Sequence, residues 1–206
     1  MHLNGIPTPT KGNTSGLILA GGRGQRFNNQ DKGFIPFQGK TLAEHAIARL
    51  APQVNTVLVS ANRHLDDYQK LEATCVQDIF SDYPGPLAGV HAALKHTELD
   101  WLVSVACDTP CFPTDYVKKL SAALSQSSSL IAVAKSNSRL QNVFMLVHKT
   151  LFRSLDKFIR NGERKAQIWL EQHNPVIVDF NKPAHAFYNI NTPEDLAEIE
   201  KLQCND

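Results

Sequence analysis

Residues 16–33 read GLILAGGRGQRFNNQDKG, and this stretch decides the fold that we expect. The apolar run 16–20 stops at two glycines, which predicts a buried strand that ends in a tight loop. Glycines after a strand let backbone N–H groups approach a phosphate, because no Cβ atom stands in the way. Arg23, Arg26 and Lys32 add positive charge beside the loop, a combination that suits a triphosphate. The alternative is an ordinary strand-to-helix turn with solvated basic residues.

Apolar and amphipathic segments alternate along the rest of the chain. Further strands are expected at 54–60, 74–77, 101–107, 130–134, 143–147 and 176–180, and helices at 41–50, 64–72, 86–96, 113–125, 149–160, 164–172 and from 192 onward. Parallel strands need crossover connections, so this alternation predicts a mostly parallel central sheet with helices on both faces. We therefore expect a Rossmann-like, single-domain, three-layer α/β/α fold over residues 16–206, preceded by a flexible tail over residues 1–15.

The composition excludes several classes of protein. The 206 residues carry 21 Lys and Arg against 20 Asp and Glu, a formal net charge of +1. This balance creates no long-range field for polyanions, so we expect neither nucleic acid nor a membrane as a partner. We see no apolar segment of signal-peptide length at the start and no later run of the ~18 residues that a membrane span needs. These features predict a cytoplasmic protein whose four cysteines are free thiols.

A second candidate site follows the most apolar expected strand, 101–107. Asp108 comes directly after this strand, and ligands of open α/β sheets bind at the carboxyl ends of strands. Mg²⁺ typically takes one or two carboxylates and completes its shell with water and substrate phosphates, so a single Asp is enough. Asp108 is therefore the candidate metal ligand. The alternative is that it caps the turn with Thr109 and Pro110.

The segment 78–89 is a weaker candidate. It contains DYPGPLAG at 82–89, a rigid loop before a helix that can place backbone groups around a base or a ribose. Asp78 follows the third expected strand and can accept a hydrogen bond from either group, or it is a surface turn residue. The histidines show no metal-ligand spacing, and His91 and His96 are expected on a helix surface.

Five motifs resemble, in the same chain order, those of the molybdenum cofactor guanylyltransferases of the nucleotidyltransferase superfamily. They are LAGG at 19–22 with Arg26 and the DKG of 31–33, then SANR at 60–63, DYPGPLAG at 82–89, CDTP at 107–110 and NINTPED at 189–195. Two positions depart from the family pattern: Ser60 stands where asparagine is usual, and Gln141–Asn142 lies where the pattern more often ends in proline.

The resemblance implies a nucleotidyltransferase fold and an enzyme that depends on Mg²⁺. This enzyme would transfer GMP from GTP to the terminal phosphate of molybdopterin or the molybdenum cofactor and release pyrophosphate. Arg26, Lys32 and Asp108 would be catalytic, with Lys32 on the phosphates and the metal on Asp108. The implied nucleotide site consists of Leu19, Ala20, Gly21, Gly22, Lys32, Ser60, Asp78 and Asp108.

The acceptor side is less clear in the sequence. Arg164 and Lys165 precede an expected helix, whose N-terminal N–H groups can receive the pterin phosphate; the alternative is a solvated helix start. The family pattern adds Asn189 and Asn191. Further partners would be molybdenum-insertion proteins and the apoproteins or chaperones of molybdoenzymes.

Two other functions stay open at this point. A sugar-phosphate nucleotidyltransferase would share the glycine loop, Lys32 and Asp108. A non-catalytic adaptor that binds GTP and delivers molybdopterin to apoenzymes would bind the nucleotide tightly without releasing pyrophosphate.

Overall fold

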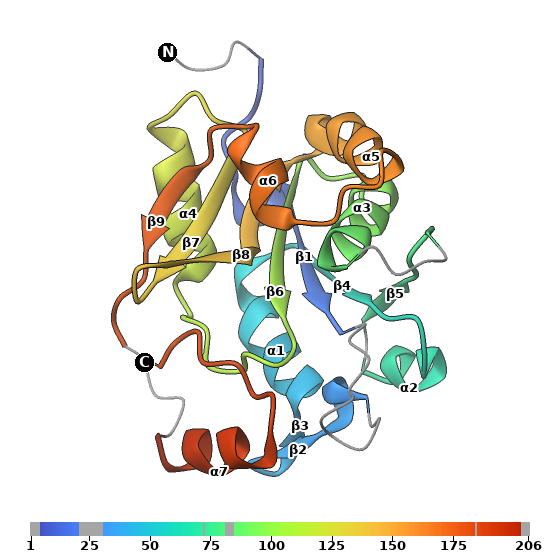
Figure 1. Ribbon diagram of the computed structural model, residues 1–206, viewed down its shortest axis with the longest axis vertical. Helices are drawn as coiled ribbons and strands as arrows, with labels where there is room; N and C mark the ends of the chain where they lie inside the picture. The colour runs from blue at the N-terminus through green and yellow to red at the C-terminus, as the bar shows by residue number, and fades with distance from the viewer. Residues whose placement is uncertain (1–4, 21–30, 72, 81–84, 184, 203–206) are drawn as a thin grey trace.

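A computed structural model describes residues 5–20, 31–71, 73–80, 85–183 and 185–202. Seven strands of this described part form one sheet in the order β5-β4-β1-β6-β8-β7-β9 (Figure 1). Of these seven, β8 alone runs antiparallel to its neighbours. The strands are β1 (Thr14–Leu19), β4 (Thr56–Ser60), β5 (Thr74–Val76), β6 (Trp101–Ala106), β7 (Ile131–Ser136), β8 (Arg139–His148) and β9 (Val176–Asp179).

Helices cover both faces of the sheet, which confirms the three-layer fold. One face packs against α1 (Leu42–Leu50) and α4 (Tyr116–Ser125), and the other against α3 (Pro86–His96), α5 (Phe152–Arg160) and α6 (Ala166–Glu171). Each face has its own apolar cluster, because side chains alternate between the two faces along every strand.

Several short elements gather at the carboxyl ends of the parallel strands (Figure 1). They are α2 (Leu65–Gln69), α7 (Pro193–Leu202), the 3₁₀ turn Lys32–Phe34, and a small hairpin of β2 (Pro36–Phe37) and β3 (Lys40–Thr41). The expected capping box opens α1: the Thr41 hydroxyl accepts from Glu44 N at 3.3 Å, and Glu44 Oε2 accepts from Thr41 N at 2.7 Å.

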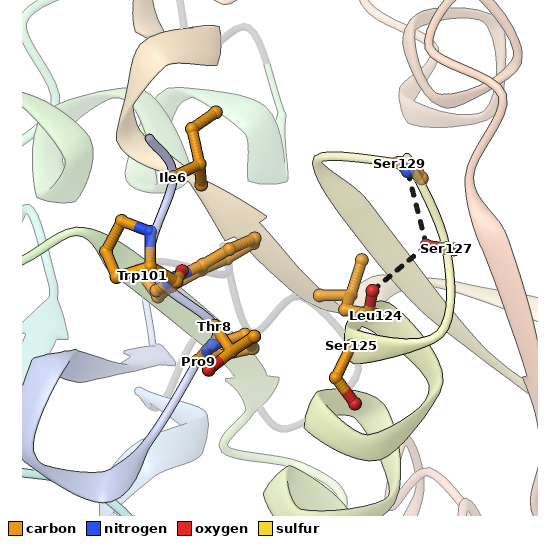
Figure 2. A pocket seen from close by; sticks show the side chains of 9 residues that line it. Ile6, Thr8, Pro9, Trp101, Leu124, Ser125, Ser127 and Ser129 are labelled. Atoms are coloured by element: carbon orange, nitrogen blue, oxygen red, sulfur yellow. Dashed lines mark hydrogen bonds between the residues drawn. The ribbon is translucent and has the colours of Figure 1, made fainter. Parts of the chain in front are cut away.

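The expected boundary at residue 16, between a flexible tail over residues 1–15 and the fold, lies two residues too late, and the flexibility of the tail stays a prediction. Strand β1 begins at Thr14, and the segment before it packs against the sheet, where Trp101 Nε1 donates to Pro7 O at 2.9 Å. Figure 2 shows the hollow that Trp101 lines here together with Ile6 and Pro9. Thr14 can be buried in a strand because its hydroxyl donates to Thr10 O at 2.7 Å.

The expected strand 143–147 is too short, because β8 begins at Arg139. Asn137 and Ser138 have positive φ angles of 49° and 62°, as a two-residue hairpin turn with the natural twist requires. This turn pairs Ser136 with Arg139 and carries polar residues into the ladder. Hydrophobicity alone therefore underestimates the strand.

Two other expectations on single residues are corrected. His91 is only 1% exposed on α3, where its ring stacks on Phe152 at 4.8 Å between centroids, so it is not a helix-surface residue. Cys75 and Cys107 are free thiols as expected, whereas Cys111 is disulfide-bonded.

No helix in the described part of the chain is long and apolar enough to cross a membrane. The cytoplasmic location stays a prediction.

Strand order places the candidate site. The chain moves from β1 outward through β4 to β5 and then returns to the other side of β1 as β6. Strands β1 and β6 are neighbours in register, with Leu19 beside Ala106. Ligands of open α/β sheets bind at such a reversal point, beyond the carboxyl ends of the two strands.

Candidate active site

Three polar side chains from distant parts of the chain meet beyond the ends of β1 and β6. Lys32 Nζ lies 3.0 Å from Asp108 Oδ2 and donates to Asn191 Oδ1 at 2.7 Å. The side chains of Lys32 and Asp108 are 18% and 17% exposed, so the pair is partly shielded but reachable from solvent. The structure thus brings together a cation, a carboxylate and an amide, the groups that a nucleoside triphosphate and its metal ion require.

A buried carboxyl group sets the turn that carries Lys32. Asp31 is 5% exposed, and its Oδ1 accepts from Gly33 N at 3.0 Å and from the Tyr68 hydroxyl at 2.7 Å. Asp31 is thereby the N-cap of the 3₁₀ turn. Neither Asp31 nor Tyr68 was assigned a role from the sequence, although Asp31 belongs to a quoted motif.

The segment before α7 is attached to the turn after β6. Ile190 N donates to Asp108 O at 2.8 Å, and the Thr109 hydroxyl donates to Asn189 Oδ1 at 2.5 Å. Asp195 then accepts from Asn191 N at 2.8 Å. These bonds explain how Asn191 reaches Lys32, and nothing in the sequence indicates that Thr109 contacts Asn189.

A second polar cluster lies at the ends of β4 and β5. Asn62 Nδ2 donates to Asp78 Oδ2 at 2.8 Å, and Asp78 N donates to Asn62 Oδ1 at 3.0 Å. Burial raises the pKa of the Asp78 carboxyl, although the side chains of Asn62 and Ser60 beside it lower the pKa. Asp78 Oδ1 is buried without a partner among the described residues. An unpartnered buried oxygen of this kind suits a ligand donor.

The expected nucleotide residues of β1 and β4 lie between the two clusters. Ser60 is buried at the end of β4, and a Cβ at Gly89 would lie 2.5 Å from its Oγ, so the glycine lets α3 approach this edge. Ala20 N donates to Ser60 O at 2.9 Å, and Leu19 O accepts from Cys107 N at 3.1 Å. The backbone hydrogen bonds between the strands therefore continue one residue past the ends of β1 and β6.

Three expected site residues, Gly21, Gly22 and Arg26, lie outside the described residues, as does Arg23. Their assignments stay predictions.

The expected acceptor cations lie in the loop between α5 and α6, next to the start of α3. Arg164 and Lys165 are exposed, and Arg164 Nη1 donates to Ile159 O at 3.3 Å and to Glu163 O at 3.2 Å. A Cβ at Gly85, just before α3, would lie 3.9 Å from Arg164 O. This loop therefore borders the start of α3, while its role toward a substrate stays a prediction.

Asp108 is the residue that fits a divalent cation. Within the described residues, no group of three or more His, Cys, Asp or Glu side chains can enclose a metal. Mg²⁺ does not need such a cage, because it accepts one or two carboxylates and takes its other ligands from water and phosphates. The partly exposed carboxylate of Asp108, beside Lys32, meets that requirement.

Comparison with known proteins gives one consistent family. The profile of the MobA-like NTP transferase domain matches residues 16–176. Molybdenum cofactor guanylyltransferases of Vibrio cholerae and Bordetella pertussis are 40% and 43% identical over 197 residues each, covering 96% and 94% of this chain and 96% and 98% of theirs. The crystal structure of molybdopterin-guanine dinucleotide biosynthesis protein A from Archaeoglobus fulgidus superimposes with a TM-score of 0.76 at 26% identity, covering 91% of this chain and 97% of that one. Sequence, fold and the position of the site agree, and the chain belongs to the molybdenum cofactor guanylyltransferase family of nucleotidyltransferases.

Proposed function

We propose that this chain transfers GMP from GTP to the terminal phosphate of molybdopterin, or of its molybdenum-bearing form, and releases pyrophosphate. The observation that carries the proposal is the contact of 3.0 Å between Lys32 Nζ and Asp108 Oδ2. It supports a single site for a triphosphate and its metal ion, because a phosphate-binding cation and a metal-binding carboxylate occupy the same edge of the sheet. The names of the relatives support the choice of GTP and molybdopterin.

The reaction asks the protein to bring two polyanions together. The acceptor phosphate is already an anion at neutral pH, so the chain needs no nucleophilic side chain and no general base. Lys32 and Arg26 neutralise the phosphates, and the loop that begins at Leu19 and Ala20 offers them the backbone N–H groups of Gly21 and Gly22, since Ala20 N already donates to Ser60 O. Asp108 would hold Mg²⁺, which when bound neutralises phosphate oxygens and lowers their mutual repulsion.

The nucleoside half of GTP belongs at the ends of β4 and β5, on the side of β1 opposite to β6. Ser60 lines this position, and Asp78 offers a buried, unpartnered oxygen that can accept a hydrogen bond from the ribose or the base. Asn62 fixes the Asp78 side chain through two hydrogen bonds. We therefore assign Ser60 and Asp78 to nucleoside binding.

The acceptor half belongs on the side of α7. Asn191 contacts Lys32, and Asn189 is held by Thr109, so both amides line the approach to Asp108. Arg164 and Lys165 supply positive charge for the pterin phosphate at the border of α3. Further partners would bind the enzyme during or after the transfer of GMP: molybdenum-insertion proteins, and the apoproteins or chaperones of molybdoenzymes.

A pyrophosphate-release assay with GTP, CTP and ATP tests the proposal. With molybdopterin and Mg²⁺ present, we expect release from GTP far above release from CTP or ATP, and none without the pterin or after chelation of the metal. Turnover of a sugar phosphate without any pterin would favour a sugar-phosphate nucleotidyltransferase instead. Tight GTP binding without pyrophosphate release would favour the adaptor function.

A further inference from the structure

Tyr68 is a fully buried residue that the motifs of the chain do not include. It lies on α2, is 0% exposed, and its hydroxyl donates to Asp31 Oδ1 at 2.7 Å. Burial raises the pKa of this hydroxyl far above its ordinary value, so it remains a donor at any working pH. A buried hydroxyl aimed at a buried carboxyl group is a specific contact, because either group alone would be costly to bury.

The Asp31 carboxyl group connects Tyr68 to Lys32. The same Oδ1 that accepts from Tyr68 also accepts from Gly33 N at 3.0 Å, on the far side of Lys32. The backbone of Lys32 is therefore held at both neighbours, and its side chain extends to Asp108 and Asn191. A lysine is a flexible point charge, so the direction of its backbone decides where the ammonium group can reach.

The fit between α2 and this turn leaves no room for change. A Cβ at Gly33 would lie 2.1 Å from the Tyr68 hydroxyl oxygen and 2.9 Å from Cζ. The Phe34 ring packs on the Tyr68 ring at 4.5 Å between centroids. Gly33 is thus required by the close approach of Tyr68.

Helix α2 also stands next to the nucleoside cluster. It follows the segment of Ser60 and Asn62 after only a few residues, and Asn62 holds Asp78. Tyr68 therefore connects the helix that follows the nucleoside segment in the chain to the turn assigned to the phosphates.

We infer that Tyr68 is a positioning residue for Lys32: it fixes the Asp31–Gly33 turn against α2 so that the lysine ammonium group meets the triphosphate beside Asp108. This inference rests on the proposed role of Lys32 in GTP binding. Tyr68 itself touches no substrate, and its effect passes through Asp31.

The first test compares Tyr68→Phe with a matched variant, Tyr116→Phe. Tyr116, on α4, is equally buried, and its hydroxyl donates to Ser104 O of β6 at 3.2 Å. This bond does not involve the Lys32 turn. We expect Tyr68→Phe to lower kcat for GTP-dependent pyrophosphate release about tenfold, as loss of a hydrogen bond to a carboxylate and a displaced lysine would. Tyr116→Phe should leave kcat within about twofold, even where both variants lower Tm.

A double-mutant cycle on GTP affinity separates positioning from general stability. Calorimetry should show that Tyr68→Phe weakens GTP binding severalfold when Lys32 is present and has no further effect in a Lys32→Ala background. Equal weakening in both backgrounds, or an unchanged kcat and affinity in Tyr68→Phe, would overturn the inference.

The close approach at Gly33 gives an independent check. Gly33→Ala should lower activity strongly, and the double variant with Tyr68→Phe should lose less than the product of the two single losses, because the atom nearest the new Cβ is removed while Cζ stays 2.9 Å away. Losses that simply multiply would contradict a shared constraint at Gly33 and Tyr68. If the wild-type enzyme released no pyrophosphate at all, the proposed function would fail, while the affinity cycle would still test the link from Tyr68 to Lys32.

Discussion

Strand β6 has a lysine–aspartate pair at each end. The two pairs have nearly the same distance between nitrogen and oxygen, but they differ in exposure and in their neighbours. At the amino end, Lys149 Nζ lies 2.9 Å from Asp100 Oδ1, with side chains 42% and 33% exposed. At the carboxyl end, Lys32 and Asp108 are 3.0 Å apart and about half as exposed, and Asn191 joins them. An exposed pair contributes little to stability, whereas a shielded pair next to an open edge can exchange its partner for a ligand.

The surroundings of the two ends differ in the same way. At the amino end, polar groups are satisfied by the chain itself: Lys149 also donates to Glu98 O, and the Ser127 hydroxyl in the hollow of Figure 2 donates to Leu124 O and accepts from Ser129 N. At the carboxyl ends of the parallel strands, Asp78 Oδ1, just after β5, remains without a partner among the described residues. We therefore expect the amino end to serve stability and the carboxyl end to serve binding.

The largest expected effect is that of Asp108→Ala on catalysis. The variant removes the proposed metal ligand and the partner of Lys32, so kcat for pyrophosphate release should fall several hundredfold, equivalent to about 3–4 kcal/mol, while the far-ultraviolet circular dichroism stays unchanged. Asp100→Ala, at the other end of the same strand, should keep kcat within about twofold. Similar losses in both variants would contradict the division between the two ends.

A smaller effect on stability is expected for Trp101→Phe at the amino end. The substitution removes the donor to Pro7 O and part of a side chain that is 2% exposed. Chemical denaturation should show a loss of about 2 kcal/mol in the free energy of unfolding, with unchanged KM for GTP. A raised KM without lost stability would mean that the amino end takes part in binding.

The smallest effect is expected for the pH dependence of stability at the same end. Burial lowers the pKa of His148, so the unfolded chain takes up this proton at a higher pH than the folded chain. The stability that neutral His148 contributes is complete above about pH 6.5 and declines as the pH falls toward the lowered folded value.

His148→Asn cannot become charged and retains an acceptor for Thr150. Its Tm should fall less than that of the wild type between about pH 7 and pH 5. The decline should persist in part, because burial also lowers the pKa values of His91 and His173. The exposed His96→Asn serves as the control, and an unchanged slope in His148→Asn would contradict the prediction.

The sequence predicts the meeting of Lys32 and Asp108 for a simple geometric reason. Both follow expected parallel strands, and the carboxyl ends of neighbouring parallel strands lie at one edge of a sheet. The periodicity of apolar residues gives the strands and helices, and thus the layers. The place of Asn191 came from the family resemblance, because nothing local to that segment indicates where it packs.

Contacts between elements far apart in sequence could not be predicted in this way. The burial of Tyr68 depends on how α2 docks on the turn at Asp31, and that of His91 on how α5 packs on α3. The sequence around Thr14 is typical of a loop, but Thr14 is buried in β1 because its hydroxyl donates to Thr10 O. Such pairings depend on tertiary structure, which outweighs local propensity.

The cluster of Lys32, Asp108 and Asn191 draws on the beginning, the middle and the end of the polypeptide, with Lys32 and Asn191 separated by 159 positions. No fragment of the chain that lacks Asn191 can assemble it. Enzymatic activity during refolding should therefore appear only after the C-terminal segment has docked, later than the secondary structure of the sheet, which makes catalysis itself a reporter of complete folding.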